Sequence, residues 1–164
     1  MATGTLYFMC GKMAAGKTTL SATLKEAHSA ILLSEGELLT DLYYEDINDF
    51  ESYLKCSGKL KAAISAHICQ LLLNGVSVVL DFPGNTRNQR KWFRELINSS
   101  NAPHELHYLD VPDEVCKAQL KKRTLESDGK GKMQTEETFD FLARYFDPPS
   151  PEEKFVVVKH SREI

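Results

Sequence analysis

Short apolar runs alternate along this chain with longer stretches in which apolar residues recur every three or four positions. Five apolar runs predict β-strands over residues 5–10, 30–33, 76–80, 105–109 and 155–159. Helical spacing predicts helices between them, over 17–27, 59–73, 86–98, 112–125 and 135–145. Strands that alternate with helices are typical of the α/β class, in which a parallel sheet is covered by helices on both faces.

The same pattern predicts one domain and one binding edge. A length of 164 residues is close to that of a single domain, and no repeat or linker interrupts residues 1–164. Right-handed crossovers bring the carboxyl ends of parallel strands to one edge of the sheet, where ligands bind. The glycine- and lysine-rich stretch around residues 126–134 separates the last two helices and is expected to be a short, mobile lid.

Composition and charge bear on which kinds of partner the protein binds and on where it is found. With 20 basic and 23 acidic residues the net charge is −3, which disfavours wholesale electrostatic binding to nucleic acid or to an anionic membrane. No apolar run approaches the roughly 20 residues of a membrane-spanning helix, and no basic stretch followed by an apolar one begins the chain. The four cysteines are scattered, without a CxxC pair. We therefore expect a cytoplasmic protein with free thiols.

A phosphate-binding loop follows the first predicted strand. Residues 11–18 read GKMAAGKT, which fits GxxxxGK[ST] between a strand and a helix. Glycines let the backbone approach a phosphate, and the loop amides and helix N-terminus supply aligned donors. Lys17 is expected to reach the β- and γ-phosphates of ATP. The predicted nucleotide-binding residues are Gly11, Lys12, Met13, Ala14, Ala15, Gly16, Lys17, Thr18 and Thr19.

A magnesium site is predicted beside this loop. Asp81 ends the third apolar run and should therefore lie at the binding edge of the sheet. In phosphate-loop proteins such an aspartate holds Mg²⁺ together with the loop hydroxyl, here that of Thr18. A turn or helix-cap role is the alternative for Asp81, since Pro83 and Gly84 follow it.

Two features favour a kinase. Glu35 and Glu37 come directly after the second predicted strand, where a carboxylate can accept a proton from an acceptor hydroxyl; Glu35, nearest the strand end, is preferred. Helix N-terminal carboxylates are the alternative reading. Arg123 ends a lysine-rich helix just before the predicted lid, where its charge can stabilise transferring phosphate oxygens.

Two further segments bear on the acceptor. Arg87 and Arg90 share a face near the start of the helix after Asp81 and are candidates for substrate or phosphate binding; an ordinary exposed basic face is the alternative. Residues 35–51 contain seven acidic residues and no basic one. This negative charge disfavours a phosphate-rich polymer as the acceptor and favours a neutral or cationic small molecule. A solvated surface helix is the alternative interpretation of the segment.

The stretches GKMAAGKTTL, VVLDFPGNTRNQRKWFREL and LDVPDEVCKAQLKKR together resemble small bacterial phosphate-loop proteins. These are grouped with zeta-toxin-like and polynucleotide-kinase-like phosphotransferases and are often labelled AAA family ATPases. The resemblance implies strand order 2-3-1-4-5, ATP as donor, a metal role for Asp81 and a lid role for Arg123. Relatives usually carry Asp where Glu35 stands, and often a second arginine where this chain has Gln119.

These observations favour an ATP- and Mg²⁺-dependent phosphotransferase acting on a hydroxyl of a small molecule or nucleotide. Two alternatives remain open at this point. One is a polynucleotide 5′-end kinase, which should have a basic groove and salt-sensitive binding. The other is a non-catalytic ATP-binding regulator. This alternative is based on Gln119, which stands where relatives often carry an arginine.

Overall fold

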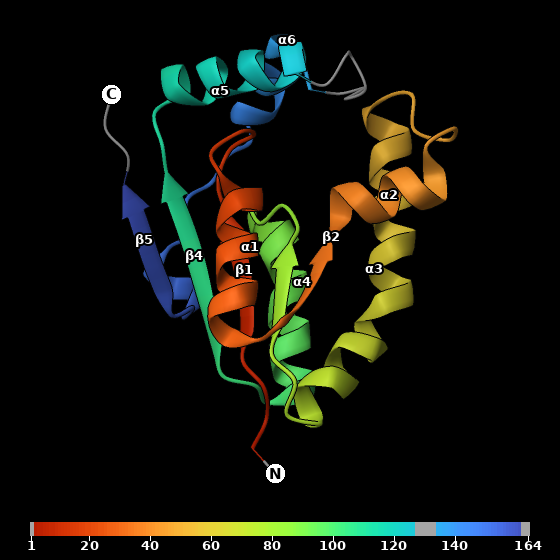
Figure 1. The fold of residues 1–164 in the computed structure, drawn as a ribbon, viewed down its shortest axis with the longest axis vertical. Coiled ribbons are helices and arrows are strands. Elements are labelled where there is room, and N and C mark those ends of the chain that lie inside the picture. The colour runs from red at the N-terminus through yellow and green to blue at the C-terminus, as the bar shows by residue number, and fades with distance from the viewer. Residues whose placement is uncertain (1, 127–133, 162–164) are drawn as a thin grey trace.

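A parallel sheet of five strands forms the centre of the computed structural model, which describes residues 2–126 and 134–161. The strands are β1 (Leu6–Cys10), β2 (Ile31–Ser34), β3 (Val78–Asp81), β4 (His104–Asp110) and β5 (Val157–Ser161). Their order is β2-β3-β1-β4-β5, and all four neighbouring pairs run parallel (Figure 1). The predicted fold class and strand order are confirmed.

Two apolar cores cover the two faces of the sheet. On one face, Phe8 and Leu80 pack with residues of α3 (Phe50–Leu73) and α4 (Arg87–Ser100). On the other face, Met9 and Val79 pack with α1 (Lys17–His28), α5 (Asp113–Glu126) and α6 (Glu136–Ala143). β1 is buried at every position because it lies at the centre of the sheet with helices on both sides (Figure 1).

The segment between β2 and β3 differs most from the prediction. Residues 35–51 include a helix, α2 (Glu35–Tyr43), and the helix expected over 59–73 begins at Phe50 instead. The Ser34 side chain accepts from the Glu37 amide at the start of α2. Asp49 and Ser52 form a capping box at the start of α3. Of the seven acidic residues only Glu35 is buried, so this segment is mainly a solvated surface.

The C-terminal strand is shifted by two residues from the predicted 155–159. Phe155 lies before β5 and packs against the Phe8 ring and the Arg94 guanidinium. The strand itself lies at the sheet edge and extends to Ser161, opposite Asp110 of β4.

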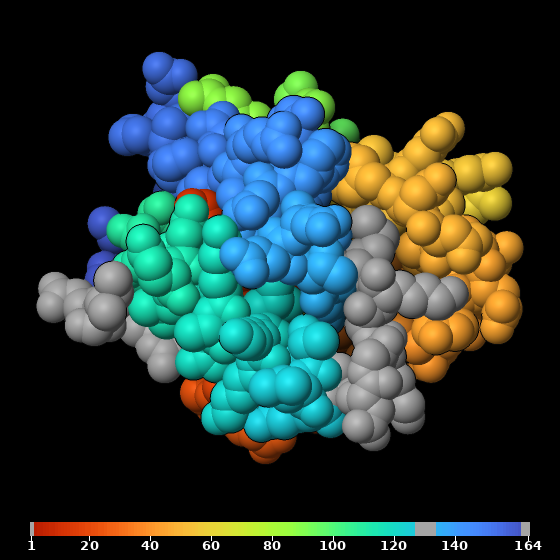
Figure 2. All heavy atoms as spheres, turned by 90° about the horizontal axis from the view of Figure 1, so that it is seen from above, coloured from red at the N-terminus to blue at the C-terminus, as the bar shows by residue number. Residues whose placement is uncertain are grey.

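Residues 127–133, most of the predicted lid, lie outside the described residues. Among the described helices, none has both the length and the apolar character needed to span a membrane. Seen from the edge where the strands end, α5 and α6 lie on one side and α2 with the start of α3 on the other (Figure 2). The loop after β1 opens onto this edge (Figure 1).

Candidate active site at the carboxyl edge of the sheet

The loop between β1 and α1 has the curvature that phosphate binding requires. Gly16 precedes α1 with a φ of 108°, a backbone conformation that glycine adopts without a side-chain clash. Ala14 also has a positive φ, 62°, and the Ala15 amide donates to the Lys12 carbonyl to close a turn. A loop of this shape before a helix N-terminus offers backbone amides to an anion.

Lys17 spans this loop from the first turn of α1. Its ammonium donates hydrogen bonds to the carbonyl of Gly11 and, at 3.2 Å, to that of Lys12. Burial lowers the pKa of Lys17, and the negative charge of Asp81 opposes that shift. The charged ammonium is therefore stabilised by carbonyl dipoles and a nearby carboxylate at the point where phosphate oxygens would meet it.

Thr18 and Asp81 form the candidate magnesium site. The Thr18 hydroxyl donates to Asp81 Oδ2 at 2.9 Å, and Asp81 lies opposite Ser34 where β3 and β2 end together. Mg²⁺ prefers oxygen ligands and is usually held by one or two protein groups together with substrate phosphates. The described residues contain no group of three or more acidic, His or Cys side chains that could hold a metal ion.

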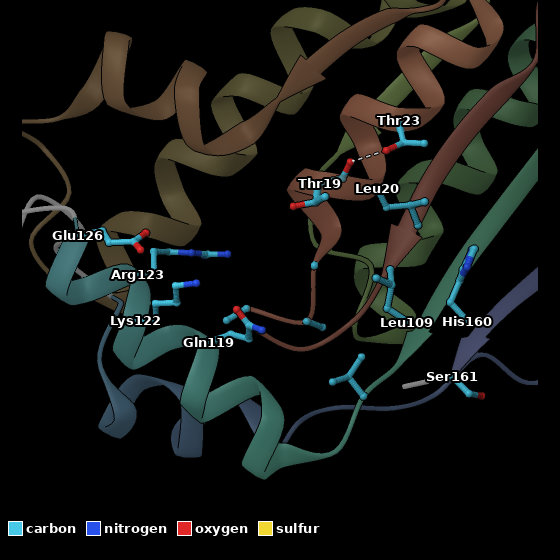
Figure 3. A pocket seen from close by; sticks show the side chains of 14 residues that line it. Thr19, Leu20, Thr23, Leu109, Gln119, Lys122, Arg123, Glu126, His160 and Ser161 are labelled. Carbon is cyan, nitrogen blue, oxygen red and sulfur yellow. Dashed lines mark hydrogen bonds between the residues drawn. The ribbon is translucent and has the colours of Figure 1, made fainter. Parts of the chain in front are cut away.

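A cleft of about 570 Å³ adjoins the loop (Figure 3). Gly16, Thr19 and Leu20 line it, as do Gln119, Lys122 and Arg123 of α5. The volume lies in the range of nucleotide and drug-sized sites. The predicted lid arginine, Arg123, thus lines the same cleft as the loop, and its charge acts on Lys17.

Glu35 lies at the same edge but is held by α3. It directly follows Ser34, which pairs with Asp81, and it is 5% exposed. Its two carboxylate oxygens accept hydrogen bonds from the Tyr53 hydroxyl at 2.5 Å and from the Ser57 hydroxyl at 2.8 Å. Burial, together with the charge of Glu35, raises the pKa of Tyr53 well above its usual value, which keeps the phenol a donor. Glu37, the alternative base, is exposed.

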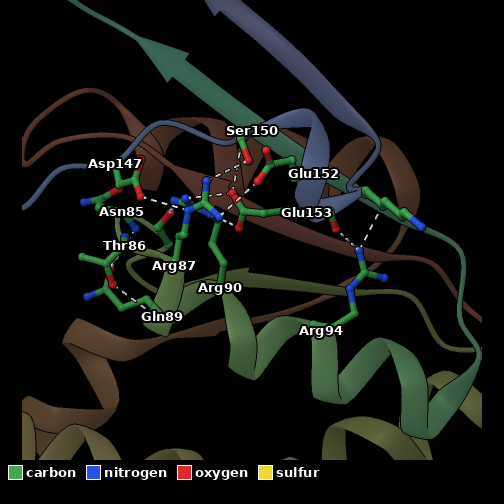
Figure 4. A network of polar contacts seen from close by, with 12 residues as sticks. Asn85, Thr86, Arg87, Gln89, Arg90, Arg94, Asp147, Ser150, Glu152 and Glu153 are labelled. Atoms are coloured by element: carbon green, nitrogen blue, oxygen red, sulfur yellow. Dashed lines mark hydrogen bonds and ion pairs between the residues drawn. The ribbon is translucent and has the colours of Figure 1, made fainter.

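The arginines predicted to bind substrate have a different placement. Arg90 is fully buried, and its guanidinium donates to both carboxylate oxygens of Glu153, at 2.8 and 3.0 Å, and to the Gly84 carbonyl. Arg87 donates to Asp147 and Ser150 (Figure 4). These two side chains therefore bind the 147–153 segment to α4, and Arg90 is not accessible to a substrate. Arg94 also binds this part of the chain, by donating hydrogen bonds to the carbonyls of Glu153 and Lys154.

Asn85 was missed by sequence reasoning. Its side-chain oxygen accepts from the Gly11 amide at 2.8 Å, and its backbone carbonyl accepts from the Asp147 amide. Asn85 therefore joins the first residue of the phosphate loop to the C-terminal segment. A polar residue four positions beyond Asp81, in the stretch DFPGNT, was the available signal. The Lys12 side chain, which belongs to the loop, forms an ion pair with Asp113 of α5 at 2.7 Å.

Solved structures, among them two kinases, share this architecture. A putative kinase from Chloroflexus aurantiacus has a TM-score of 0.75 at 18% identity, covering 98% of this chain and 86% of that chain. APS kinase CysC of Mycobacterium tuberculosis, in complex with AMPPNP and APS, has a TM-score of 0.66 at 12% identity, covering 99% and 92%. Kti12 of Chaetomium thermophilum, in complex with ADP-AlF3, has a TM-score of 0.65 at 16% identity, covering 94% and 88%.

No curated protein sequence matches this chain. Residues 6–149 match the family AAA_33, described as an AAA domain. That range runs from the start of β1 to a point just before the last strand, so it contains the phosphate loop, Asp81 and Arg123. The predicted resemblance is thereby confirmed: this chain, with its phosphate loop and kinase-like sheet, belongs to the AAA_33 family of AAA domains.

Proposed function

We propose that this protein is an ATP- and Mg²⁺-dependent phosphotransferase that acts on a hydroxyl of a small molecule or nucleotide. One observation carries the proposal: the phosphate loop, Lys17 and the Thr18–Asp81 pair meet at the edge where the strands end. A cleft large enough for a nucleoside adjoins them. The kinase folds among the similar structures agree with this assignment.

In the proposed reaction, residues of the phosphate loop and of α5 would bind the phosphates of ATP. The loop amides and Lys17 bind and orient the β- and γ-phosphates. Arg123 faces the cleft from α5, where its charge favours the transferring oxygens and helps to exclude water. Mg²⁺, held by Thr18 and Asp81, would neutralise charge on the phosphate oxygens.

On the acceptor side, Glu35 is the proposed proton acceptor. Hydroxyls of Tyr53 and Ser57 orient its carboxylate, and each oxygen keeps a further lone pair for an acceptor hydroxyl. Because the rest of the acidic 35–51 segment is exposed, its charge still disfavours an anionic polymer at this side.

A nucleotide-binding regulator is the second candidate. Both oxygens of Glu35 are engaged by α3, and Gln119 lies in the cleft where relatives often carry an arginine. Such a protein would bind ATP and hydrolyse it slowly, with no stimulation by any acceptor.

Calorimetry with ATP and Mg²⁺ tests the binding step. Replacing Lys17 by Ala removes charge-assisted hydrogen bonds to phosphate of about 1.5–3 kcal/mol, or roughly tenfold to a hundredfold in Kd. Lys25→Ala is the matched control, because Lys25 is exposed at the far end of the same helix. ATP binding that is unchanged in Lys17→Ala would refute the role of the loop.

The transfer step requires an acceptor panel. Consumption of ATP is measured with hydroxyl-bearing metabolites, nucleosides and an oligonucleotide with a free 5′-hydroxyl. Stimulation by a small molecule or nucleoside supports the proposal, and stimulation by the oligonucleotide favours an end kinase. Slow hydrolysis that no acceptor accelerates favours the regulator.

A further inference from the structure

Three side chains form a hydrogen-bonded chain that ends at the nucleotide cleft. His107, which is 4% exposed on β4, has its Nε2 atom 3.0 Å from Glu105 Oε1. Its Nδ1 atom lies 2.8 Å from Nε2 of His160 on β5. His160 lines the cleft, at the end away from Arg123 (Figure 3). The residues of the phosphate loop do not take part in these hydrogen bonds.

The order of donors and acceptors along the chain follows from its first member. An ionised carboxylate only accepts, so Nε2 of His107 must donate to Glu105. Burial lowers the pKa of His107, against the opposing effect of Glu105, which favours a neutral ring. A neutral imidazole has one donor and one acceptor, so Nδ1 of His107 accepts from Nε2 of His160. A neutral His160 is then left with an unprotonated Nδ1 as its second polar atom.

A nucleotide bound in the cleft would have its phosphates at one end and its base at the other. Arg123 acts electrostatically on Lys17, so the part of the cleft beside α5 faces the triphosphate. His160 and Ser161 lie at the opposite end, next to Leu109 (Figure 3). The base is the part of a nucleoside triphosphate farthest from the γ-phosphate, and it would therefore lie beside His160.

We propose that His160 is a specificity-determining residue, whose Nδ1 accepts a hydrogen bond from the exocyclic amino group of adenine. Glu105 and His107 are positioning residues that fix this acceptor. A base with an oxo group at the same position would direct a lone pair at the lone pair of Nδ1, and both would stay unsatisfied. The inference rests on the proposed function, because it requires a nucleotide in the cleft.

The test compares ATP with inosine triphosphate, in which an oxo group replaces the 6-amino group and N1 carries a proton. Calorimetry with Mg²⁺ should show ATP bound at least about tenfold more tightly by the unmodified protein, from one bond lost and one acceptor left unpaired. His160→Ala should bring this ratio close to one. Lys159→Ala is the matched control, because Lys159 is exposed and pairs with Asp110; it should keep the ratio.

Two further variants separate positioning from folding. Glu105→Ala removes the acceptor that orients His107 and should lower the ratio, whereas Glu105→Gln keeps an acceptor oxygen and should restore it. Equal binding of the two nucleotides to the unmodified protein, or an unchanged ratio in His160→Ala, would overturn the inference and leave the proposed function intact. Failure to bind either nucleotide would overturn both.

Discussion

The buried ion pair between Arg90 and Glu153 offers a direct test of how the active-site edge is held together. Arg90 is fully buried and the Glu153 side chain is 12% exposed. Glu153→Gln preserves shape but removes the charge that balances the guanidinium. Breaking a buried pair in this way costs about 3–5 kcal/mol, a large part of the roughly 5–15 kcal/mol by which a domain is stable.

The expected loss of unfolding free energy in Glu153→Gln is large enough to measure, and a matched control exists. For a domain of this length, about 2–4 °C of Tm per kcal/mol corresponds to a fall of roughly 6–20 °C. Calorimetric unfolding measures it. Glu152→Gln is the control, because Glu152 is 83% exposed and lies 3.8 Å from Arg87; exposed pairs contribute no more than about 1 kcal/mol. A Tm for Glu153→Gln equal to that of the control would refute the reasoning.

The same pair predicts a dependence on pH. Burial acts to raise the pKa of Glu153, but hydrogen bonds from Arg90 and the Ser150 amide outweigh it and hold the pKa below its usual value. A carboxyl whose pKa is lower in the folded state stabilises the protein above its unfolded pKa, near 4.3, and this contribution is lost as the pH falls through the folded value. The stability gap between the unmodified protein and Glu153→Gln should therefore narrow below about pH 4. A gap that stays constant between pH 7 and pH 3 would contradict this assignment.

Four other substitutions have defined outcomes. Gly58→Ala should raise the free energy of unfolding by about 0.5–1 kcal/mol, since Gly58 is inside α3 and an added Cβ meets nothing within 4 Å. Gly84→Ala should lower it, because its Cβ would lie 2.4 Å from a β1 carbonyl oxygen; urea unfolding of both variants checks the opposite signs. Asn85→Asp keeps an acceptor for the loop amide but adds negative charge beside the phosphates, so calorimetry should show weaker ATP binding with an unchanged Tm. Tyr53→Phe removes one of two donors to Glu35 and should lower kcat more than it changes the KM for ATP, which steady-state kinetics measures.

Local sequence patterns were sufficient to predict the sheet and the phosphate loop. The apolar runs of β1 and β3 and the motif between Gly11 and Thr18 each depend on neighbouring residues. The motif is where the sequence predicted it, β1 begins one residue later than predicted, and β3 covers Val78–Asp81 instead of 76–80. The pairing of Thr18 with Asp81 also follows from pattern, because both lie at the same edge once the strands are parallel.

Other features depend on contacts between distant residues. Arg90 reads as a surface cation, but its partner Glu153 lies 63 positions away and no periodicity connects them. The start of α3 was missed because Gly58 and the polar residues around it weaken the helical pattern, while the capping box of Asp49 and Ser52 sets the true start. The apolar run at 155–159 predicts the last strand, but β5 covers Val157–Ser161 and lies at the sheet edge with alternate residues exposed.

The two sides of the candidate active site come from different stretches of the polypeptide. On the side of the phosphate loop, Asn85 joins Gly11 to Asp147, and the arginines of α4 bind the same C-terminal segment. The proposed acceptor side, with Glu35 and Tyr53, lies wholly in α2 and α3, between β2 and β3. In the proposed enzyme, substitutions confined to α2 and α3 would therefore alter the acceptor side and leave the phosphate loop and its partners untouched.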